Sequence, residues 1–333
     1  MNKQHQISLP NSKEYKQTLV SQSSKKHLPT VPFSKKGLLA ELPPPPSGKT
    51  GWPWTVETPS PTLTMPSGFP YPKISIVTPS YNQGQFIEQT IRSVLLQNYP
   101  NLEYVIYDGG SSDNTVQILE KYSPWLSFWQ NKKDRGFGNA INLGFDMCIG
   151  DYFGWINSDD FYLPNCFQMV GNYASQYSPD FIYGDSISLY NNDRETCYWQ
   201  GGFILDRYLR FASLISSHAA FWKSSIHVPI AENINCAIDY ELWLRLLPGR
   251  TKRHIPSPLG VFRVQPESKS ANKRYVKQWE EDIERIAKVH GAPPRPRSFL
   301  YYEFTLVQRL YKRLIQLKQL AKQLSNPLII GEK

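Results

Sequence analysis

The amino-acid sequence predicts an α/β protein in which a mostly parallel sheet is covered by helices. Short β-branched segments alternate with amphipathic segments from residue 73 onward, and this alternation is typical of parallel strands joined by helices. The 333 residues are 40% hydrophobic and 14% aromatic, which is enough to bury a sizeable core. A Pro-rich N-terminal arm, expected to be disordered, and a C-terminal amphipathic helix complete the predicted architecture.

The elements follow in chain order from the first strand, over residues 74–78, which is β-branched and bounded by prolines. Apolar residues at positions 87, 91, 94 and 95 then fall on one face of a helix. The same reasoning predicts further strands over 104–107, 126–130 and 152–156, and helices over 116–122 and 139–147. Ligands of such sheets bind outside the carboxyl ends of the strands, so the functional residues are expected there.

Residues 1–72 form the predicted arm. Lys, Gln and Ser dominate its first part, and prolines recur from Pro43 to Pro72. Because proline lacks a backbone donor and fixes φ, this segment is expected to be extended or disordered. Trp52 and Trp54 are unusual for pure disorder, and they can dock in an apolar groove of the body.

The formal net charge of +9 is concentrated at the two ends of the chain. Residues 1–72 carry +5, residues 295–333 carry +6, and residues 73–294 sum to −2. The body therefore lacks the basic face of a nucleic-acid-binding protein, and no nucleic-acid partner is expected. No apolar run follows the first residues and no run of about 18 apolar residues occurs in this sequence, so neither a signal peptide nor a membrane span is expected. The four scattered cysteines predict neither a disulfide framework nor a metal site. A cytoplasmic protein is expected.

The C-terminal extension, residues 291–333, contains apolar residues spaced three and four apart with Lys and Arg between them. The apolar positions are Val307, Leu310, Leu314, Leu317, Ala321 and Leu324. A basic amphipathic helix of this kind packs on the body, pairs as a coiled coil or makes peripheral contact with an anionic membrane. The sequence leaves these three alternatives open.

Polar clusters follow three of the predicted strands, at residues 78–82, 108–113 and 157–160. Each cluster taken singly is typical of a helix cap or a turn, but all three are expected to converge in one crevice. Gly109 and Gly110 permit close approach of a ligand to the backbone. The two carboxylates of residues 159–160 are hard oxygen donors suited to Mg²⁺ or Mn²⁺ with phosphate. The first strand lacks the glycine fingerprint of dinucleotide-binding proteins.

These motifs resemble glycosyltransferase family 2. The resemblance is carried by Ile76-Val77-Thr78-Pro79-Ser80-Tyr81-Asn82, Tyr107-Asp108-Gly109-Gly110-Ser111-Ser112-Asp113, Asn157-Ser158-Asp159-Asp160, Ile238-Asp239-Tyr240-Glu241 and Phe262-Arg263. The motifs occur in the family's order over roughly residues 73–270. The resemblance implies a GT-A-like (Rossmann-like) fold over residues 73–290, with a nucleotide-sugar half (73–160) and an acceptor half (161–290). It also implies an inverting, metal-assisted transfer from a nucleotide sugar.

The resemblance also implies roles for individual residues. Asp239 matches the general base that removes a proton from the acceptor hydroxyl. Asp159 and Asp160 match the metal-proximal positions, with Asp160 as the expected direct ligand of Mn²⁺ or Mg²⁺. The expected donor-binding residues are Pro79, Tyr81, Asp108, Gly109, Asn139, Asp159 and Arg263.

Several positions depart from the family pattern or keep two interpretations. Asn157 and Asn139 stand where Asp is frequent, which lowers the carboxylate count. Gln265 stands where His is frequent, so it is not assigned as a metal ligand. His218 falls in the region that borders the acceptor, or it is a structural residue. Arg263 pairs with the diphosphate or anchors the C-terminal loop.

The sequence therefore predicts a hexosyltransferase-type glycosyltransferase, with a role in polysaccharide biosynthesis. The acceptor is expected to be a carbohydrate, a lipid-linked molecule or a protein. Two alternatives are a catalytically inactive nucleotide-binding module of the same fold and a nucleotidyltransferase. The intact Asp239 speaks against the first, and the missing Gly-rich basic loop after the first strand speaks against the second.

Overall fold

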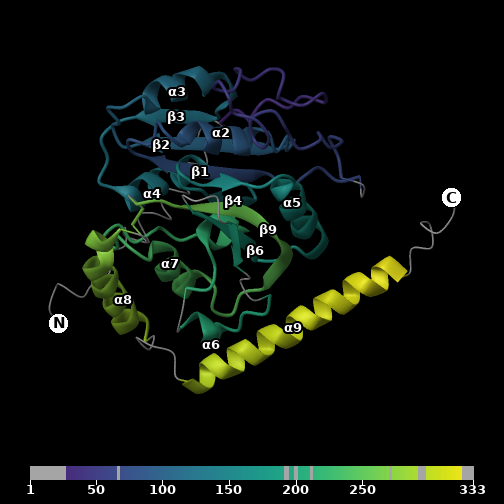
Figure 1. The fold of residues 1–333 in the computed structure, drawn as a ribbon, viewed down its shortest axis with the longest axis vertical. Helices are drawn as coiled ribbons and strands as arrows, with labels where there is room; N and C mark the ends of the chain where they lie inside the picture. The colour runs from purple at the N-terminus through teal and green to yellow at the C-terminus, as the bar shows by residue number, and fades with distance from the viewer. Residues whose placement is uncertain are drawn as a thin grey trace.

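A computed structural model describes residues 28–65, 68–190, 195–198, 202–210, 213–266, 268–269, 272–291 and 298–324 (Figure 1). The strands are β1 (Ile74–Ser80), β2 (Leu102–Asp108), β3 (Phe128–Asn131), β4 (Tyr152–Trp155), β5 (Phe161–Tyr162), β6 (Phe181–Tyr190), β7 (Glu195–Tyr198), β8 (Ala220–Lys223) and β9 (Lys252–Val264). The α-helices are α2 (Ile87–Leu95), α3 (Thr115–Tyr122), α4 (Phe137–Met147), α5 (Cys166–Tyr177), α6 (Asp206–Leu209), α7 (Ile238–Leu246), α8 (Val276–His290) and α9 (Ser298–Leu324). Short 3-10 helices are η3 (Ser123–Trp125), η4 (Ser217–Ala219), η5 (Ser224–Ile226) and η6 (Lys273–Tyr275).

One sheet joins all of these strands, in the order β3-β2-β1-β4-β8-β6-β9-β5, with β7 paired to β6. The four strands β3, β2, β1 and β4 are parallel. Strand β8 is antiparallel to both β4 and β6, whereas β6 and β9 are parallel to each other. Strands β6 and β9 therefore point the same way as β1. The prediction of a mostly parallel sheet covered by helices is confirmed.

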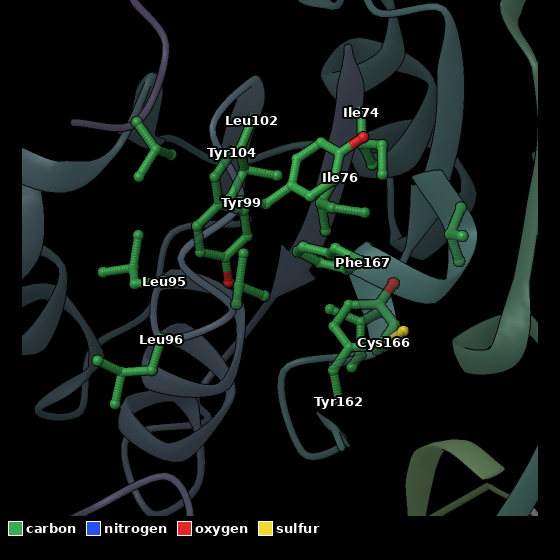
Figure 2. Packing of buried hydrophobic residues seen from close by; sticks show 14 of the residues in the cluster. Ile74, Ile76, Leu95, Leu96, Tyr99, Leu102, Tyr104, Tyr162, Cys166 and Phe167 are labelled. Carbon is green, nitrogen blue, oxygen red and sulfur yellow. The ribbon is translucent and has the colours of Figure 1, made fainter. Parts of the chain in front are cut away.

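Successive residues of β1 supply two different cores because strand side chains alternate between the faces of a sheet. Ile74 and Ile76 pack with residues of α2, α3 and α5, and Figure 2 shows the part of this core around Tyr99 and Phe167. Val77 packs in a second core with residues of α4 and α7. Both faces of the sheet are thus covered.

The expectation of a disordered arm is corrected for residues 28–65 and 68–72, which pack on the body. The Val31 N–H donates to a β2 backbone carbonyl at 2.8 Å. The indole Nε1 of Trp52 donates to a β5 backbone carbonyl, also at 2.8 Å. The suggestion that the two tryptophans dock is therefore confirmed. Residues 1–27 lie outside the described residues.

Arg92 of α2 explains why a Pro-rich segment can be ordered without joining the sheet. Its side chain is fully buried and donates to the carbonyls of Pro43, Pro53 and Trp54 at 2.8, 2.9 and 2.9 Å. Its Nη1 also donates to the Tyr122 hydroxyl at 3.0 Å. A segment rich in proline lacks the N–H donors for a regular ladder, so its carbonyls need other donors, and one guanidinium satisfies three of them.

The C-terminal helix is present as α9, which Figure 1 shows extending away from the body beyond α6. Among the described helices, none combines the length and the apolar character needed to cross a membrane. The proposed boundaries near residues 72, 160 and 290 stay predictions.

Candidate active site

The carboxyl ends of β1, β2 and β4 border a cavity of about 1120 Å³. Its other walls come from the start of α4, η4, the segment leading into α7, the loop after β9 and the start of α8. Six of the predicted site residues line it, namely Pro79, Tyr81, Gly109, Asp159, His218 and Asp239. The other four, Asp108, Asn139, Asp160 and Arg263, are not among the lining residues.

Asp108 folds the glycine loop that follows β2. Its side chain is buried, and Oδ1 accepts from Ser111 N at 2.8 Å and from Asn131 Nδ2 at 2.6 Å, while Oδ2 accepts from Ser111 Oγ at 2.5 Å. Gly110 has a φ of +92°, and a Cβ there would lie 3.2 Å from Lys133 N. Only glycine adopts this positive φ readily and leaves room for the backbone of Lys133. Asp108 thus holds the loop of Gly109 and Gly110 against the cavity.

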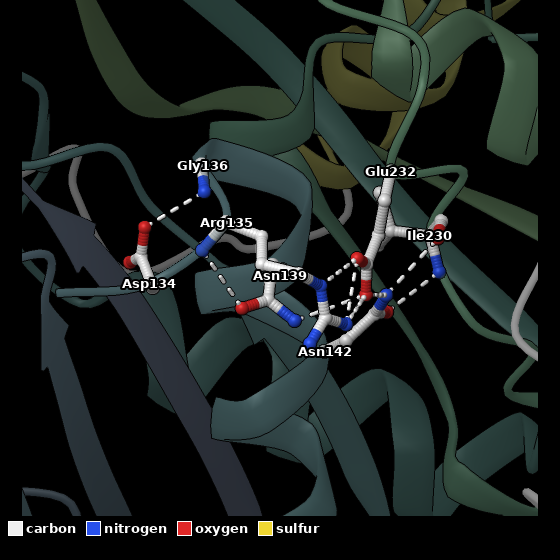
Figure 3. A network of polar contacts seen from close by, with 7 residues as sticks. All are labelled: Asp134, Arg135, Gly136, Asn139, Asn142, Ile230 and Glu232. Carbon is white, nitrogen blue, oxygen red and sulfur yellow. Dashed lines mark hydrogen bonds and ion pairs between the residues drawn. The ribbon is translucent and has the colours of Figure 1, made fainter.

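Asn139 of α4 belongs to a polar network beside the cavity (Figure 3). Its Oδ1 accepts from Arg135 N at 3.2 Å and its Nδ2 donates to Glu232 Oε1 at 3.0 Å. Arg135 forms a two-nitrogen ion pair with the same Glu232, at 2.8 to 3.1 Å. Asp134, which lines the cavity, accepts from Gly136 N at 2.7 Å. Asn139 therefore positions the loop that carries Asp134.

The two aspartates after β4 occupy different environments. Asp159 lines the cavity, and its Oδ2 accepts from Gln265 Nε2 at 2.8 Å. Asp160 has no exposed surface, and its oxygens accept from Arg263 N at 2.9 Å and from Asn157 Nδ2 at 3.1 Å. Burial raises the pKa of both carboxyls, and the neighbouring charge of Asp159 adds to the rise at Asp160. Of the pair, Asp159 is the one placed to meet a ligand.

Arg263 holds this loop from behind. Its Nε donates to the carbonyl of Asp159 at 2.9 Å, and its Nη2 donates to Gln89 Oε1 of α2 at 2.9 Å. The guanidinium lies 4.8 Å from the centroid of the Phe86 ring. These contacts match the anchoring interpretation of Arg263.

Asp239 enters the cavity from the first turn of α7. The preceding Ala237 has a φ of +55°, a left-handed conformation that is unusual for a residue with a Cβ. Asp239 Oδ1 accepts from Tyr240 N at 2.8 Å. Burial raises the pKa of Asp239 to about 6, which is the range that suits a general base near neutral pH.

His218 and Trp155 present buried polar atoms to the cavity that have no partner in the described part of the chain. These atoms are His218 Nε2 and Trp155 Nε1. Burial lowers the pKa of His218 to about 4, so the ring is neutral at pH 7. The His218 ring stacks on Phe262, with 5.9 Å between centroids. Three more unpartnered buried polar atoms line the same cavity, namely Ser80 Oγ, Gln83 Oε1 and Asn157 Oδ1. Buried polar groups normally have partners, so this cavity is built for a polar ligand.

Sequence reasoning missed three basic residues that line the cavity, Lys133, Lys269 and Arg274. Lys269 Nζ donates to Asn235 Oδ1 at 2.6 Å and lies 5.1 Å from the Phe137 ring centroid. None of the three lies in a recognisable motif, and two come from the segment after β9, Lys269 from its loop and Arg274 from η6. Only the folded chain brings this segment to the cavity.

The residues present fit a divalent cation that is shared with a phosphate ligand. No group of three or more His, Cys, Asp or Glu side chains suited to a metal occurs in the described part of the chain. The cavity does present the Asp159 carboxylate and the unpartnered Asn157 Oδ1 after the same strand. Mg²⁺ and Mn²⁺ sites commonly use one or two such oxygens and take the remainder from phosphate and water.

Residues 75–229 match the sequence profile of Glycosyl transferase family 2. The chondroitin synthase of Escherichia coli is 29% identical over 194 residues, which cover 55% of this chain and 28% of that protein. The chain spans at most about three fifths of the length of the curated relatives it matches.

Two solved structures share the fold. S. aureus TarS 1-349 in complex with UDP-GlcNAc has a TM-score of 0.54 and 18% identity over 66% of each chain. A mannosyltransferase of Pyrobaculum calidifontis in complex with GDP-Man and Mn²⁺ has a TM-score of 0.51 and 16% identity over 74% of this chain and 70% of that one. The expected GT-A-like α/β fold is confirmed. The profile match over residues 75–229, the ordered motifs and the fold confirm the resemblance to glycosyltransferase family 2.

Proposed function

We propose that this protein transfers a sugar from a nucleoside-diphosphate sugar to an acceptor hydroxyl, with inversion at the anomeric carbon. The observation that carries the proposal is that Asp239 and Asp159 line one cavity from opposite halves of the chain. Asp239, with a pKa of about 6, is ionised at neutral pH and can accept a proton. Asp159 stands at the carboxyl edge of the sheet, where nucleotides bind in folds of this type.

In this reaction Asp239 removes the proton of the acceptor hydroxyl. The acceptor oxygen forms a bond to the anomeric carbon while the bond from that carbon to the diphosphate oxygen breaks on the opposite face. A divalent cation, Mn²⁺ or Mg²⁺, neutralises the leaving diphosphate when bound, and Asp159 and Asn157 would hold it. The basic side chains of Lys133, Lys269 and Arg274 add positive charge around the same cavity.

The substrate class also belongs to the proposal. Among the neighbours in fold, TarS was solved with UDP-GlcNAc and the mannosyltransferase with GDP-Man and Mn²⁺. A hexose donor and a role in polysaccharide biosynthesis agree with the relative named chondroitin synthase. We expect the reaction to take place in the cytoplasm.

The test is a screen of UDP- and GDP-sugars with and without Mn²⁺, using water as the surrogate acceptor. We expect release of nucleoside diphosphate from one donor, with a matching thermal shift of the protein. Release of pyrophosphate in a parallel assay with a nucleoside triphosphate and a sugar 1-phosphate would identify a nucleotidyltransferase instead. Binding of the nucleotide sugar without release, also in the presence of candidate carbohydrate and lipid-linked acceptors, would indicate an inactive binding module.

A further inference from the structure

Helix α9 packs on the body through one side of its first half. The rings of Tyr208 and Phe304 are 5.1 Å apart between centroids. Gln308 Nε2 donates to the carbonyl of Phe203 at 3.1 Å. Glu303 forms an ion pair with Arg207 of α6. The side that carries Phe304 and Gln308 therefore already has its partner in the body.

A second apolar face of α9 lies on the side opposite Phe304 and Gln308. We call it the outer face; its members are 52 to 76% exposed and are Phe299, Leu306, Leu310, Leu314 and Leu317. Glu303, seven residues before Leu310, also lies on this face and pairs with Arg207 near its N-terminal end. The spacings of the apolar members, seven, four, four and three residues, keep them on one side of a helix. Leu310 lies about 200° around the helix from Gln308, at about 100° per residue. Three residues of the predicted apolar stripe, Leu310, Leu314 and Leu317, are thus not the ones that bind the body.

The outer face is bordered by positive charge. Arg309 and Arg313 are exposed and follow one edge of this face, and the sequence adds Lys318 beside the other edge, whereas Lys312 and Lys322 lie further around the helix. The single acidic residue of α9 is Glu303, which is paired with Arg207. Two copies of this helix that met through their outer faces would bring like charges together without acidic partners. Coiled coils instead rely on complementary charges beside their apolar seam.

We propose that α9 lies on the surface of an anionic lipid bilayer, with the outer face among the headgroups. An apolar face bordered by Lys and Arg suits this surface because burial of leucines and attraction to anionic lipid act together. A row of exposed leucines is also costly in water unless a partner covers it. This proposal does not depend on the transfer reaction.

The test is co-sedimentation of the full chain with lipid vesicles. We expect binding to vesicles of equal parts phosphatidylcholine and phosphatidylglycerol, release of the protein at high salt and little binding to phosphatidylcholine alone. Equal binding to both vesicles, or to neither at low salt, would overturn the proposal. A dimer in sedimentation velocity that dissociates when the outer face is made polar would overturn it in favour of self-association.

Paired variants separate the outer face from general effects. The triple variant Leu310→Ser/Leu314→Ser/Leu317→Ser should abolish binding, whereas Leu63→Ser/Val276→Ser/Val289→Ser, at other exposed positions, should not. Arg309→Gln/Lys312→Gln/Arg313→Gln should lower vesicle affinity about fivefold per residue, or on the order of a hundredfold in total. The control Lys35→Gln/Lys36→Gln/Lys288→Gln removes the same charge elsewhere and should have less than a tenth of that effect. Equal losses in a variant and its control would contradict the assignment to α9.

Discussion

The buried guanidinium of Arg92 donates a 2.9 Å hydrogen bond to the carbonyl of Trp54 and lies 5.7 Å from the centroid of its ring. This contact joins a helix of the sheet to a segment that has no regular secondary structure. The arm is consequently part of the folded body over residues 28–65 and 68–72.

Arg92→Met should destabilise the protein strongly. The substitution keeps much of the side-chain volume but leaves the carbonyls of Pro43, Pro53 and Trp54 without a donor. Because a buried unsatisfied acceptor costs about 1–3 kcal/mol, we expect a loss of at least about 3 kcal/mol in the free energy of unfolding. Urea denaturation measures it. The control Lys121→Met removes an exposed ion pair with Glu88 and should cost about 1 kcal/mol or less. Equal effects would mean that the arm is not held by Arg92.

Asn139→Asp should destabilise the protein in a pH-dependent way. The new carboxylate would oppose Glu232 Oε1, which now accepts from Asn139 Nδ2 at 3.0 Å. The two like charges raise the pKa of the pair in the folded state, so the folded protein binds more protons than the unfolded chain. Stability relative to wild type therefore falls as pH rises through the range of these raised pKa values.

The measurement is the melting temperature at pH 5 and at pH 8, where we expect the larger deficit at pH 8. Asn139→Ala breaks the same hydrogen bonds without adding a charge, so its deficit should change little with pH. A deficit of Asn139→Asp that is the same at both pH values would show that repulsion from Glu232 is not the cause. The network thus offers a physical reason for Asn at a position where relatives often have Asp.

Substitution of Asp159 should affect nucleotide binding, whereas substitution of Asp160 should affect stability. Asp159→Asn should reduce the Mn²⁺-dependent affinity for UDP or GDP on the order of tenfold to a hundredfold, because this carboxylate faces the cavity. Asp160→Asn should mainly lower the melting temperature. Both oxygens of Asp160 accept hydrogen bonds, from Arg263 N and Asn157 Nδ2, and the NH₂ of an amide would face one of these N–H groups and lose that bond. Calorimetric titration with and without Mn²⁺ distinguishes them. Loss of metal dependence in Asp160→Asn alone would restore Asp160 as the direct ligand.

Asp239→Asn should lower kcat on the order of a hundred- to ten-thousand-fold, because an amide cannot accept the acceptor's proton. Nucleotide affinity should change little. In the wild type, kcat should rise with pH to a plateau, with its midpoint near the Asp239 pKa of about 6. A mutant with wild-type turnover would remove Asp239 from the reaction.

The same substitution should stabilise the fold at neutral pH. Burial raises the Asp239 pKa from 3.8 to about 6, so the folded protein holds a proton that the unfolded chain releases between these values. Wild-type stability therefore falls as pH rises through this window. Asp239→Asn should be more stable than wild type by about 1–3 kcal/mol at pH 8, and the difference should vanish near pH 4. Chemical denaturation at both pH values measures it, and a pH-independent difference would contradict the raised pKa.

Much of the part of the fold from β1 to β4 could be predicted because the sequence patterns of its strands and helices are local. The alternation of β-branched runs and helical periodicity located the elements from β1 to β4, and the order of β1, β2 and β4 explains why their polar ends meet. The motifs after these strands pointed to the cavity for the same reason. Each such pattern spans about ten consecutive residues, the length of one strand or helix, so it can be recognised without knowledge of long-range contacts.

What the sequence determined by itself is therefore the fold class, the family motifs and the edge of the sheet where the site lies. Only the tertiary structure decided which of two adjacent aspartates faces the cavity, because that depends on the long-range contacts of Arg263 and Gln265. It also decided that the Pro-rich arm is ordered, since its carbonyls find Arg92 some 40 to 50 positions further along the chain. Finally, it decided which apolar side of α9 meets the body. Periodicity reveals that a helix has an apolar side, but the partner of that side is a property of the folded chain.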